Sequence, residues 1–172
     1  MVWFTLFVLA VGLERLAELV IAKRNTDWSL ARGGYEVGRS LYPVMVVVHA
    51  GLLVGALVEV AVADRPFLPW LGWPMVAVVL ATQALRWWCI ATLGRQWNTR
   101  VIVVPGAPRV TGGPYRWLAH PNYLAVVVEG IALPLVHTAW VTAVLFTTAN
   151  AAVLTVRIRT ENLALSALVP NP

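Results

Sequence analysis

The sequence predicts an all-α integral membrane protein of about five helices, and three observations support this fold class. Hydrophobic residues make up 59% of the 172-residue chain, whereas charged residues make up only 12%. A soluble domain carries about 25% charged residues, so this chain has too little polar surface to cover itself in water. Apolar runs long enough to cross a bilayer recur along the chain, and basic residues gather at their ends.

Five apolar segments match, or nearly match, the roughly 20 residues needed to cross the hydrocarbon core. Each is bounded by charge, glycine or proline, which are common where helices end. The fourth segment is short, and His137 and Thr138 leave almost no loop before the fifth, so these two are expected to form a tight helical hairpin. Whether the hairpin fully crosses the bilayer stays open. The predicted spans are residues 2–22, 44–62, 70–93, 121–136 and 139–156.

The distribution of basic residues predicts the orientation, because cytoplasmic segments of membrane proteins are enriched in Lys and Arg. Outside the spans, the side opposite the long loops carries only Arg65. We therefore expect the N-terminus outside and the long loops and C-terminus in the cytoplasm. The net charge of +5 then serves topology and contact with anionic lipid rather than nucleic acid. The basic residues on the predicted cytoplasmic side are Lys23, Arg24, Arg32, Arg39, Arg95, Arg100, Arg109, Arg116, Arg157 and Arg159.

The chain is expected to form one membrane domain, with three helices in residues 1–93 and a loop, the hairpin and a tail in residues 94–172. The loop 94–120 is rich in Gly and Pro, which favour turns, and loops of this length usually have a function. Residues 99–104 are rich in β-branched side chains and are expected to be extended, but no partner strand is evident. A single cysteine, Cys89, excludes an internal disulfide and a cysteine-based metal cluster, and no metal site is predicted.

Ionisable residues inside a span are costly unless they are paired or face a cavity. In the first span, Glu14 and Glu18 share a helix face, and Arg15 can reach Glu18 at i,i+3. The simplest interpretation is a structural ion pair that holds this helix against its neighbours. The alternative is that these residues line a polar site. Glu129 and Asn150 place further polar atoms in the fourth and fifth spans.

A second polar cluster lies at residues 111–123, where the loop meets the fourth span. Pro121 is suited to begin a helix, because the first helical turn has no N–H bond to lose. The free amides of that turn and the helix dipole favour a carboxylate or another polar ligand. Tyr115, His120 and Tyr123 add an aromatic, hydrogen-bonding rim. The alternative is that these residues mark the headgroup level, where such side chains are common.

A third cluster lies at the cytoplasmic end of the fifth span, where Arg157 and Glu161 are one helical turn apart. Its predicted depth matches that of the second cluster, so the two are expected to meet across one cavity. The alternative is a snorkelling arginine with a surface ion pair. The sequence contains no phosphate-binding loop, zinc motif, nucleophile elbow or dinucleotide-binding glycine motif.

Several short segments carry a family resemblance. They are Gly113-Pro-Tyr-Arg, His120-Pro-Asn-Tyr, and the run from Arg157-Ile to Glu161-Asn and Leu165, with Leu93-Gly-Arg-Gln-Trp-Asn-Thr and Glu14-Arg-Leu-Ala-Glu upstream. Together they resemble the isoprenylcysteine carboxyl methyltransferase family, particularly its small bacterial members, over nearly the whole chain. The combination of HPxY, a helical hairpin and RxxxE is more specific than any single piece.

The resemblance implies a methyltransferase of the bacterial inner (cytoplasmic) membrane that converts S-adenosylmethionine to S-adenosylhomocysteine. The expected acceptor is a carboxylate, phenol or enol oxygen of a lipophilic or prenylated molecule dissolved in membrane lipid, and no obligate protein partner is evident. Arg157 and Glu161 would be the catalytic residues between cofactor and acceptor. The family usually has Arg where this chain has Ala119, and Arg116 is the candidate to supply that charge. The cofactor pocket would comprise Thr111, Tyr115, Arg116, Leu118, His120, Pro121, Tyr123, Glu129 and Asn150.

Two other function classes remain open. Some sterol reductases look similar in their C-terminal helices but bind NADPH there, although this chain lacks their additional helices. A non-enzymatic scaffold or transporter subunit would instead use buried acids such as Glu14, Glu18 and Glu59 for ion passage.

Overall fold

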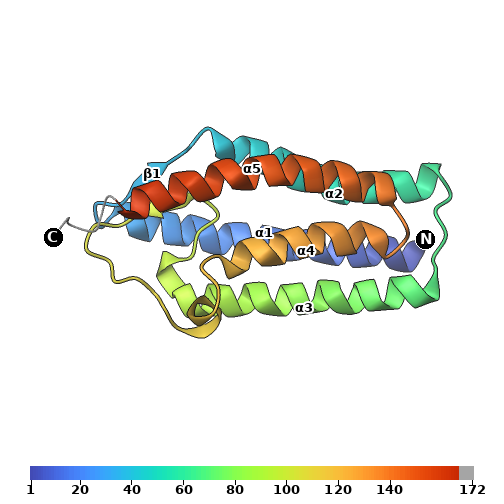
Figure 1. Ribbon diagram of the computed structural model, residues 1–172, viewed down its shortest axis with the longest axis horizontal. Helices are drawn as coiled ribbons and strands as arrows, with labels where there is room; N and C mark the ends of the chain where they lie inside the picture. Colours follow the sequence, from blue (N-terminus) through green and yellow to red (C-terminus); the bar gives the residue numbers. More distant parts are fainter. Residues whose placement is uncertain (167–172) are drawn as a thin grey trace.

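The structure, a computed structural model, describes residues 1–166 and shows five α-helices lying lengthwise, with a two-stranded ribbon at one end (Figure 1). Successive helices alternate in direction, so the first begins at one end of the molecule and the last finishes at the other. The last part of the predicted C-terminal tail, residues 167–172, lies outside the described residues. The elements are α1 (Val2–Leu30), β1 (Tyr35–Val37), α2 (Leu41–Val62), α3 (Pro69–Leu93), η1 (Gly94–Gln96), β2 (Val101–Val103), η2 (Gly113–Arg116), α4 (Pro121–Leu135) and α5 (Trp140–Ser166).

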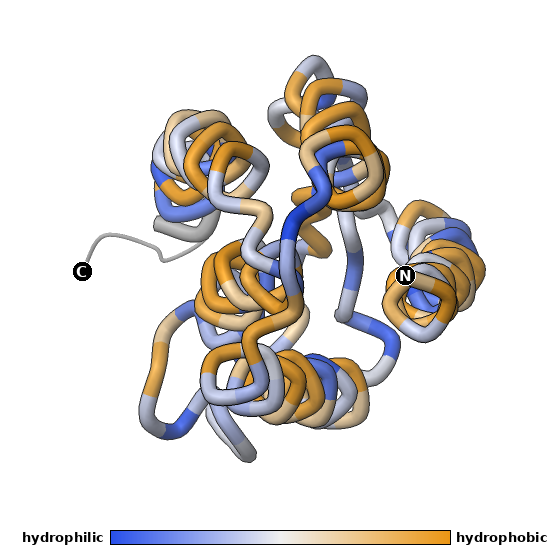
Figure 2. Tube along the Cα trace, turned by 90° about the vertical axis from the view of Figure 1, so that its right-hand side faces the viewer, coloured by the Kyte–Doolittle hydropathy of each residue, from blue (hydrophilic) through white to orange (hydrophobic). Residues whose placement is uncertain are grey.

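Three helices are long and apolar enough to cross a membrane. α4 is apolar but has only 15 residues, and α1 interrupts its apolar run with the charged cluster around Arg15, so crossing by these two stays a prediction. Seen along the bundle, hydrophobic residues recur along every helix, with hydrophilic residues interspersed (Figure 2). Val62 and Val47 are 80% and 70% exposed, which suits contact with lipid. The three candidate spans are Leu41–Val62, Pro69–Gln96 and Trp140–Ala164.

Two helices extend well beyond the predicted spans. α1 continues to Leu30 instead of ending at residue 22, and α5 continues to Ser166 instead of ending at residue 156. The apolar runs mark where lipid contact ends, but no glycine or proline interrupts either helix at that point. The additional turns therefore project from the apolar part of the bundle and flank the loop between α3 and α4.

The extended segment after η1 has a partner strand, contrary to the sequence-based expectation. β1 and β2 pair antiparallel, with Tyr35 opposite Val103 and Val37 opposite Val101. Gly34 allows the turn into β1, because a Cβ at this position would lie 2.7 Å from the carbonyl oxygen of Ser29. The strands are three residues long and far apart in the sequence, so neither periodicity nor a hairpin turn signalled the pairing.

The apolar core lies in the half of the bundle away from the ribbon. Its buried side chains come from α1, α2, α3, α4 and α5, and include Phe4, Leu52 and Leu133. Gly130 lets α4 approach α5 closely, because a Cβ there would lie 1.9 Å from the ring of Phe146. The close contact fixes the predicted hairpin between the two helices.

The N-terminus of α5 is capped by an acid from another helix. The Glu59 carboxylate, on α2, accepts hydrogen bonds from the backbone N–H groups of Val141 at 3.2 Å and Thr142 at 2.7 Å. It also pairs with Arg65 at 2.9 Å. A carboxylate at this position satisfies free amides and complements the helix dipole.

Replacing Glu59 with alanine is expected to destabilise the protein by about 1–3 kcal/mol, because the amides at the start of α5 lose a charged acceptor. Thermal unfolding in detergent micelles would measure the effect. The matched control is Asp64→Asn, which changes an exposed acid at the same end of the bundle. Equal unfolding midpoints for Glu59→Ala and the control would show that the cap contributes little.

Candidate functional site

A cavity of about 430 Å³ lies at the ribbon end of the bundle, within the predicted cytoplasmic part. Its volume falls in the range of small-molecule sites, about 300–1,000 Å³. Most of its lining comes from the loop between α3 and α4 with β2, the first turn of α4 and the last turns of α5, and Ser29 of α1 and Leu93 of α3 also border it. Its polar wall includes Asn98, Arg100, Arg109, Tyr115, His120, Asn122, Tyr123, Arg157 and Glu161.

Four of these side chains form a connected chain along the wall. Arg157 Nε donates to the hydroxyl of Tyr123 at 2.8 Å, and that hydroxyl donates to one oxygen of Glu161. The other Glu161 oxygen lies 3.8 Å from Nδ1 of His120, whose ring stacks on Tyr123 with centroids 5.2 Å apart. α4 and its N-cap carry two of these residues and α5 the other two, so the second and third sequence clusters meet across one cavity.

Arg157 is buried, with 7% of its surface exposed. Besides the Tyr123 hydroxyl, its guanidinium contacts the sulfur of Met45, 2.8 Å from Nη1. No ion pair joins it to a carboxylate within residues 1–166; Glu161 is reached through the Tyr123 hydroxyl. This arrangement differs from a snorkelling side chain in a surface ion pair. A buried cation is costly unless an anion compensates it, so Arg157 is suited to hold an anionic group.

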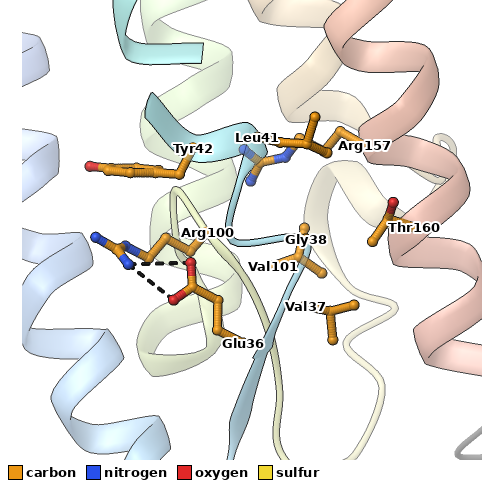
Figure 3. A pocket seen from close by; sticks show the side chains of 9 residues that line it. All are labelled: Glu36, Val37, Gly38, Leu41, Tyr42, Arg100, Val101, Arg157 and Thr160. Carbon is orange, nitrogen blue, oxygen red and sulfur yellow. Dashed lines mark hydrogen bonds and ion pairs between the residues drawn. The ribbon is translucent and has the colours of Figure 1, made fainter. Parts of the chain in front are cut away.

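A second, smaller space of about 10 Å³ also borders Arg157 (Figure 3). This volume is close to what one water molecule requires. Arg100, which borders both spaces, pairs with Glu36 of β1 at 3.0 Å. Its guanidinium also lies over the ring of Tyr42 on α2, 4.2 Å from the centroid. The ribbon is therefore fastened to the start of α2 beside Arg157.

The large cavity has unused hydrogen-bonding capacity. Asn122 Oδ1 and Trp97 Nε1 are buried and have no hydrogen-bond partner among the described residues, and both side chains contribute to the cavity wall. α4 begins at Pro121 without a side-chain cap. Buried polar groups are normally satisfied, so a spare acceptor, a spare donor and an uncapped helix N-terminus favour a polar ligand.

η2 places Tyr115 on the wall. Gly113 allows η2 to lie against α3, since a Cβ there would be 2.4 Å from Oγ1 of Thr92, and its φ of +54° suits glycine. Burial is the main cause that raises the pKa of Tyr115 above its ordinary value, and the adjacent Cys89 thiol adds to the effect. Tyr115 therefore remains a neutral hydroxyl at physiological pH.

The structure divides the predicted site residues into two groups. The cavity wall includes Tyr115, His120, Tyr123, Arg157 and Glu161. The remaining six do not line it: Thr111, Arg116 and Leu118 are exposed, whereas Pro121, Glu129 and Asn150 are buried elsewhere.

Two of these six have clear surroundings. The Arg116 guanidinium lies 5.7 Å from the Trp117 ring centroid and does not line the wall beside Ala119. Glu129 pairs with Arg15 at 2.5 Å. The cofactor contacts implied for these two residues therefore find no support in the geometry.

Sequence reasoning missed several wall residues. Asn122 stands inside the HPNY segment, and its place in the first turn of α4 could have indicated it. Arg109 is one of several basic residues in a loop without periodicity, so nothing distinguished it. Arg100 was counted only for its charge, because its position depends on the unpredicted ribbon.

Comparison with known proteins supports the resemblance. Residues 75–167 match the isoprenylcysteine carboxyl methyltransferase (ICMT) family. The chain is 39% identical over 166 residues to the uncharacterized protein YpbQ of Bacillus subtilis, covering 96% of each chain. It is 24% identical over 159 residues to an uncharacterized protein of Haemophilus influenzae, covering 91% of each. The family match spans more than half of the chain and includes α4, α5 and most of the cavity wall, so this protein belongs to the isoprenylcysteine carboxyl methyltransferase family.

Proposed function

We propose that the protein transfers a methyl group from S-adenosylmethionine to an oxygen of a lipophilic acceptor dissolved in the membrane. The oxygen belongs to a carboxylate, a phenol or an enol. Membership of the family implies membrane methyltransferase activity. The observation that carries the finer proposal is the Arg157–Tyr123–Glu161 chain on the wall of the 430 Å³ cavity. The cavity would face the cytoplasm of a bacterial inner membrane, with the N-terminus outside.

The residues present fit this cofactor. Its carboxylate would be held by the backbone N–H of Asn122 in the uncapped first turn of α4, because Pro121 has no N–H and the N–H groups of Tyr123 and Leu124 donate to the carbonyl of His120. Its amino and hydroxyl groups would find an acceptor in the unpartnered Asn122 Oδ1. Glu161 would supply a negative charge near the cationic sulfur, and the rings of His120 and Tyr123 would supply flat surfaces for packing.

When bound, the cofactor supplies an electrophilic methyl group, and the protein needs mainly to align the acceptor oxygen with it and exclude water. Arg157 would hold an anionic acceptor oxygen by charge-assisted hydrogen bonds. A carboxylate acceptor needs no base. A phenol, with a pKa near 10, would gain from a base, and Glu161 is the wall carboxylate suited to that role.

The position of the cavity suits two reactants from different phases. The loop between α3 and α4 covers it on the side away from the apolar bundle, which suits a water-soluble cofactor. Exposed apolar side chains, Leu118 and Leu124, flank the His120–Tyr123 turn and suit lipid contact, being 42% and 46% exposed. A site at this boundary lets each reactant approach from its own phase.

Calorimetry on the purified protein is expected to show binding of S-adenosylhomocysteine, weakened at least about 10-fold by His120→Ala or Tyr123→Ala, because each removes a packing surface of the cavity. Trp117→Ala, which removes an exposed ring beside the same turn, is the control and should bind normally. Absence of binding in several detergents and in lipid would contradict the proposal. Preferential binding of NADPH in competition would favour the reductase class instead.

A further inference from the structure

A buried polar cluster links α1, α3 and α4, outside the cavity described above. Arg15 is its centre: Nη1 contacts Glu18 at 2.7 Å, and Nη2 contacts Gln83 at 2.7 Å and Glu129 at 2.5 Å. Glu18 also accepts two hydrogen bonds from Arg86 of α3. The side chains of Arg15 and Glu129 are 17% and 6% exposed. The sequence-based interpretation of a structural ion pair around Arg15 is confirmed, and the pair extends across three helices.

Glu129 is the α4 member of this cluster, and α4 also carries Tyr123. The two are six positions apart, and an α-helix turns about 100° per residue, so their side chains lie about 120° apart around the helix axis. Tyr123 meets Arg157 and Glu161 of α5, whereas Glu129 meets Arg15 of α1. A rotation of α4 that releases Glu129 would therefore swing Tyr123 away from its two partners.

We propose that Arg15 and Glu129 are positioning residues, whose ion pair fixes the rotation of α4 and thereby holds Tyr123 against Arg157 and Glu161. The inference rests on the proposed function for its effect on rate, but its geometric part does not. The buried side chains of α4 lie mostly from Glu129 onward, whereas only Pro121 and Ala125 are buried before it, so fewer packing contacts constrain the turns that carry Tyr123. A directional, charge-assisted hydrogen bond between buried groups supplies the missing constraint.

This inference gives α1 a role in the reaction. Arg15 and Glu18 lie outside the residues that match the family model, whereas Gln83, Arg86 and Glu129 lie inside them. The N-terminal helix therefore completes a polar cluster whose other half belongs to the family segment. Its contribution would be through α4, because Arg15 does not line the cavity.

The first test compares Glu129→Gln with Glu129→Met. Glutamine keeps an oxygen that can accept from Arg15, whereas methionine has a similar length without a comparable acceptor. Arg15 keeps Glu18 as its partner in both variants, so neither leaves the guanidinium unpaired. We expect Glu129→Met to lower kcat about 100-fold, the scale of a 1 Å misplacement, while Glu129→Gln keeps most of the rate.

Two further measurements separate positioning from other roles. The unfolding midpoint of Glu129→Met should fall, because Glu18 must then compensate both Arg15 and Arg86, whereas Arg15→Met/Glu129→Met, which removes the whole pair, should unfold near the unmodified protein. The affinity for S-adenosylhomocysteine should change less than kcat. Equal rates for the two variants, or a loss of affinity that accounts for the rate, would overturn the inference. If Glu129→Met fails to fold, the double variant Arg15→Met/Glu129→Met takes its place with the same expectation.

A second test does not depend on activity. Asn122→Cys places a thiol on the cavity wall, and Leu124→Cys places one on the exposed apolar side of α4. A charged, water-soluble thiol reagent should label position 122 faster than position 124, with buried Cys89 as the unreactive background. Glu129→Met should reduce the ratio of the two labelling rates at least about 10-fold.

The labelling result also distinguishes the two proposals. If the protein shows no methyl transfer but Glu129→Met still reduces the ratio of labelling rates, the positioning role is supported and the proposed function is contradicted. An unchanged ratio in a slow variant would overturn the positioning role and leave the proposed function intact.

Discussion

Arg157→Met is expected to lower kcat/KM for methyl transfer about 100- to 1,000-fold, the scale seen when a buried electrostatic contact to the reacting group is removed. Arg157 is buried, has no paired carboxylate within residues 1–166, and orients the Tyr123 hydroxyl. Methionine fills a similar volume without charge, so the fold should persist. Radiolabelled cofactor and membrane extracts would measure transfer, and mass spectrometry of the labelled lipid would identify the acceptor.

Two further variants make this expectation specific. Arg159→Met removes an exposed arginine two residues further along α5 and should leave the rate unchanged. Arg157→Lys keeps the charge but loses the planar fork that contacts the Tyr123 hydroxyl and the Met45 sulfur together, so it should recover only part of the rate. A full rate in Arg157→Met would mean that the buried guanidinium has a purely structural function.

Glu161→Gln is expected to lower kcat about 100- to 10,000-fold if the acceptor is a phenol or enol, the range for losing a general base. The substitution keeps the size of the side chain and an oxygen for the Tyr123 hydroxyl, so the chain to Arg157 can still form. The affinity for S-adenosylhomocysteine should fall only a few-fold. Initial rates and calorimetry on the same preparation would measure both quantities.

Comparing the loss of rate with the loss of cofactor affinity shows whether Glu161 acts on the acceptor or on the cofactor. Equal losses of rate and affinity would move its role from the acceptor to the cofactor pocket. A small loss of rate would favour a carboxylate acceptor, which needs no base. The matched control is Asp27→Asn. It neutralises a largely exposed acid on α1, at the same end of the bundle as Glu161, and should change neither the rate nor the affinity.

Much of the fold follows from hydropathy and helix boundaries. α3 ends at Leu93, as predicted, because Gly94 follows it, and α4 begins at Pro121, as predicted. The lengths of α1 and α5 were underestimated, because apolar periodicity reports contact with lipid and says nothing of a helix that continues into water. The ribbon was missed because its pairing is non-local and short.

The candidate site was predictable where chemistry and local spacing coincide. The residues of HPxY lie within one or two helical turns of each other, and so do those of RxxxE. Because the two motifs have the same predicted depth in the membrane, the sequence predicted that Tyr123 and Glu161 would meet. Glu129 was harder to assign, because the sequence does not say which neighbour its face of α4 meets. Its partner Arg15 lies in a helix far away in the chain, and only the tertiary arrangement pairs them.

The unbroken course of α5 makes lipid thickness a variable of the reaction. A single continuous helix extends from its N-terminus, which is capped by Glu59, to Arg157 and Glu161 at the cavity. Where the hydrocarbon core is thicker than the apolar length of α5, either the helix tilts less or the bilayer thins around it. Each response changes the height of the guanidinium relative to the headgroups. An acceptor anchored by its tail would then present its oxygen at a different distance from the methyl donor.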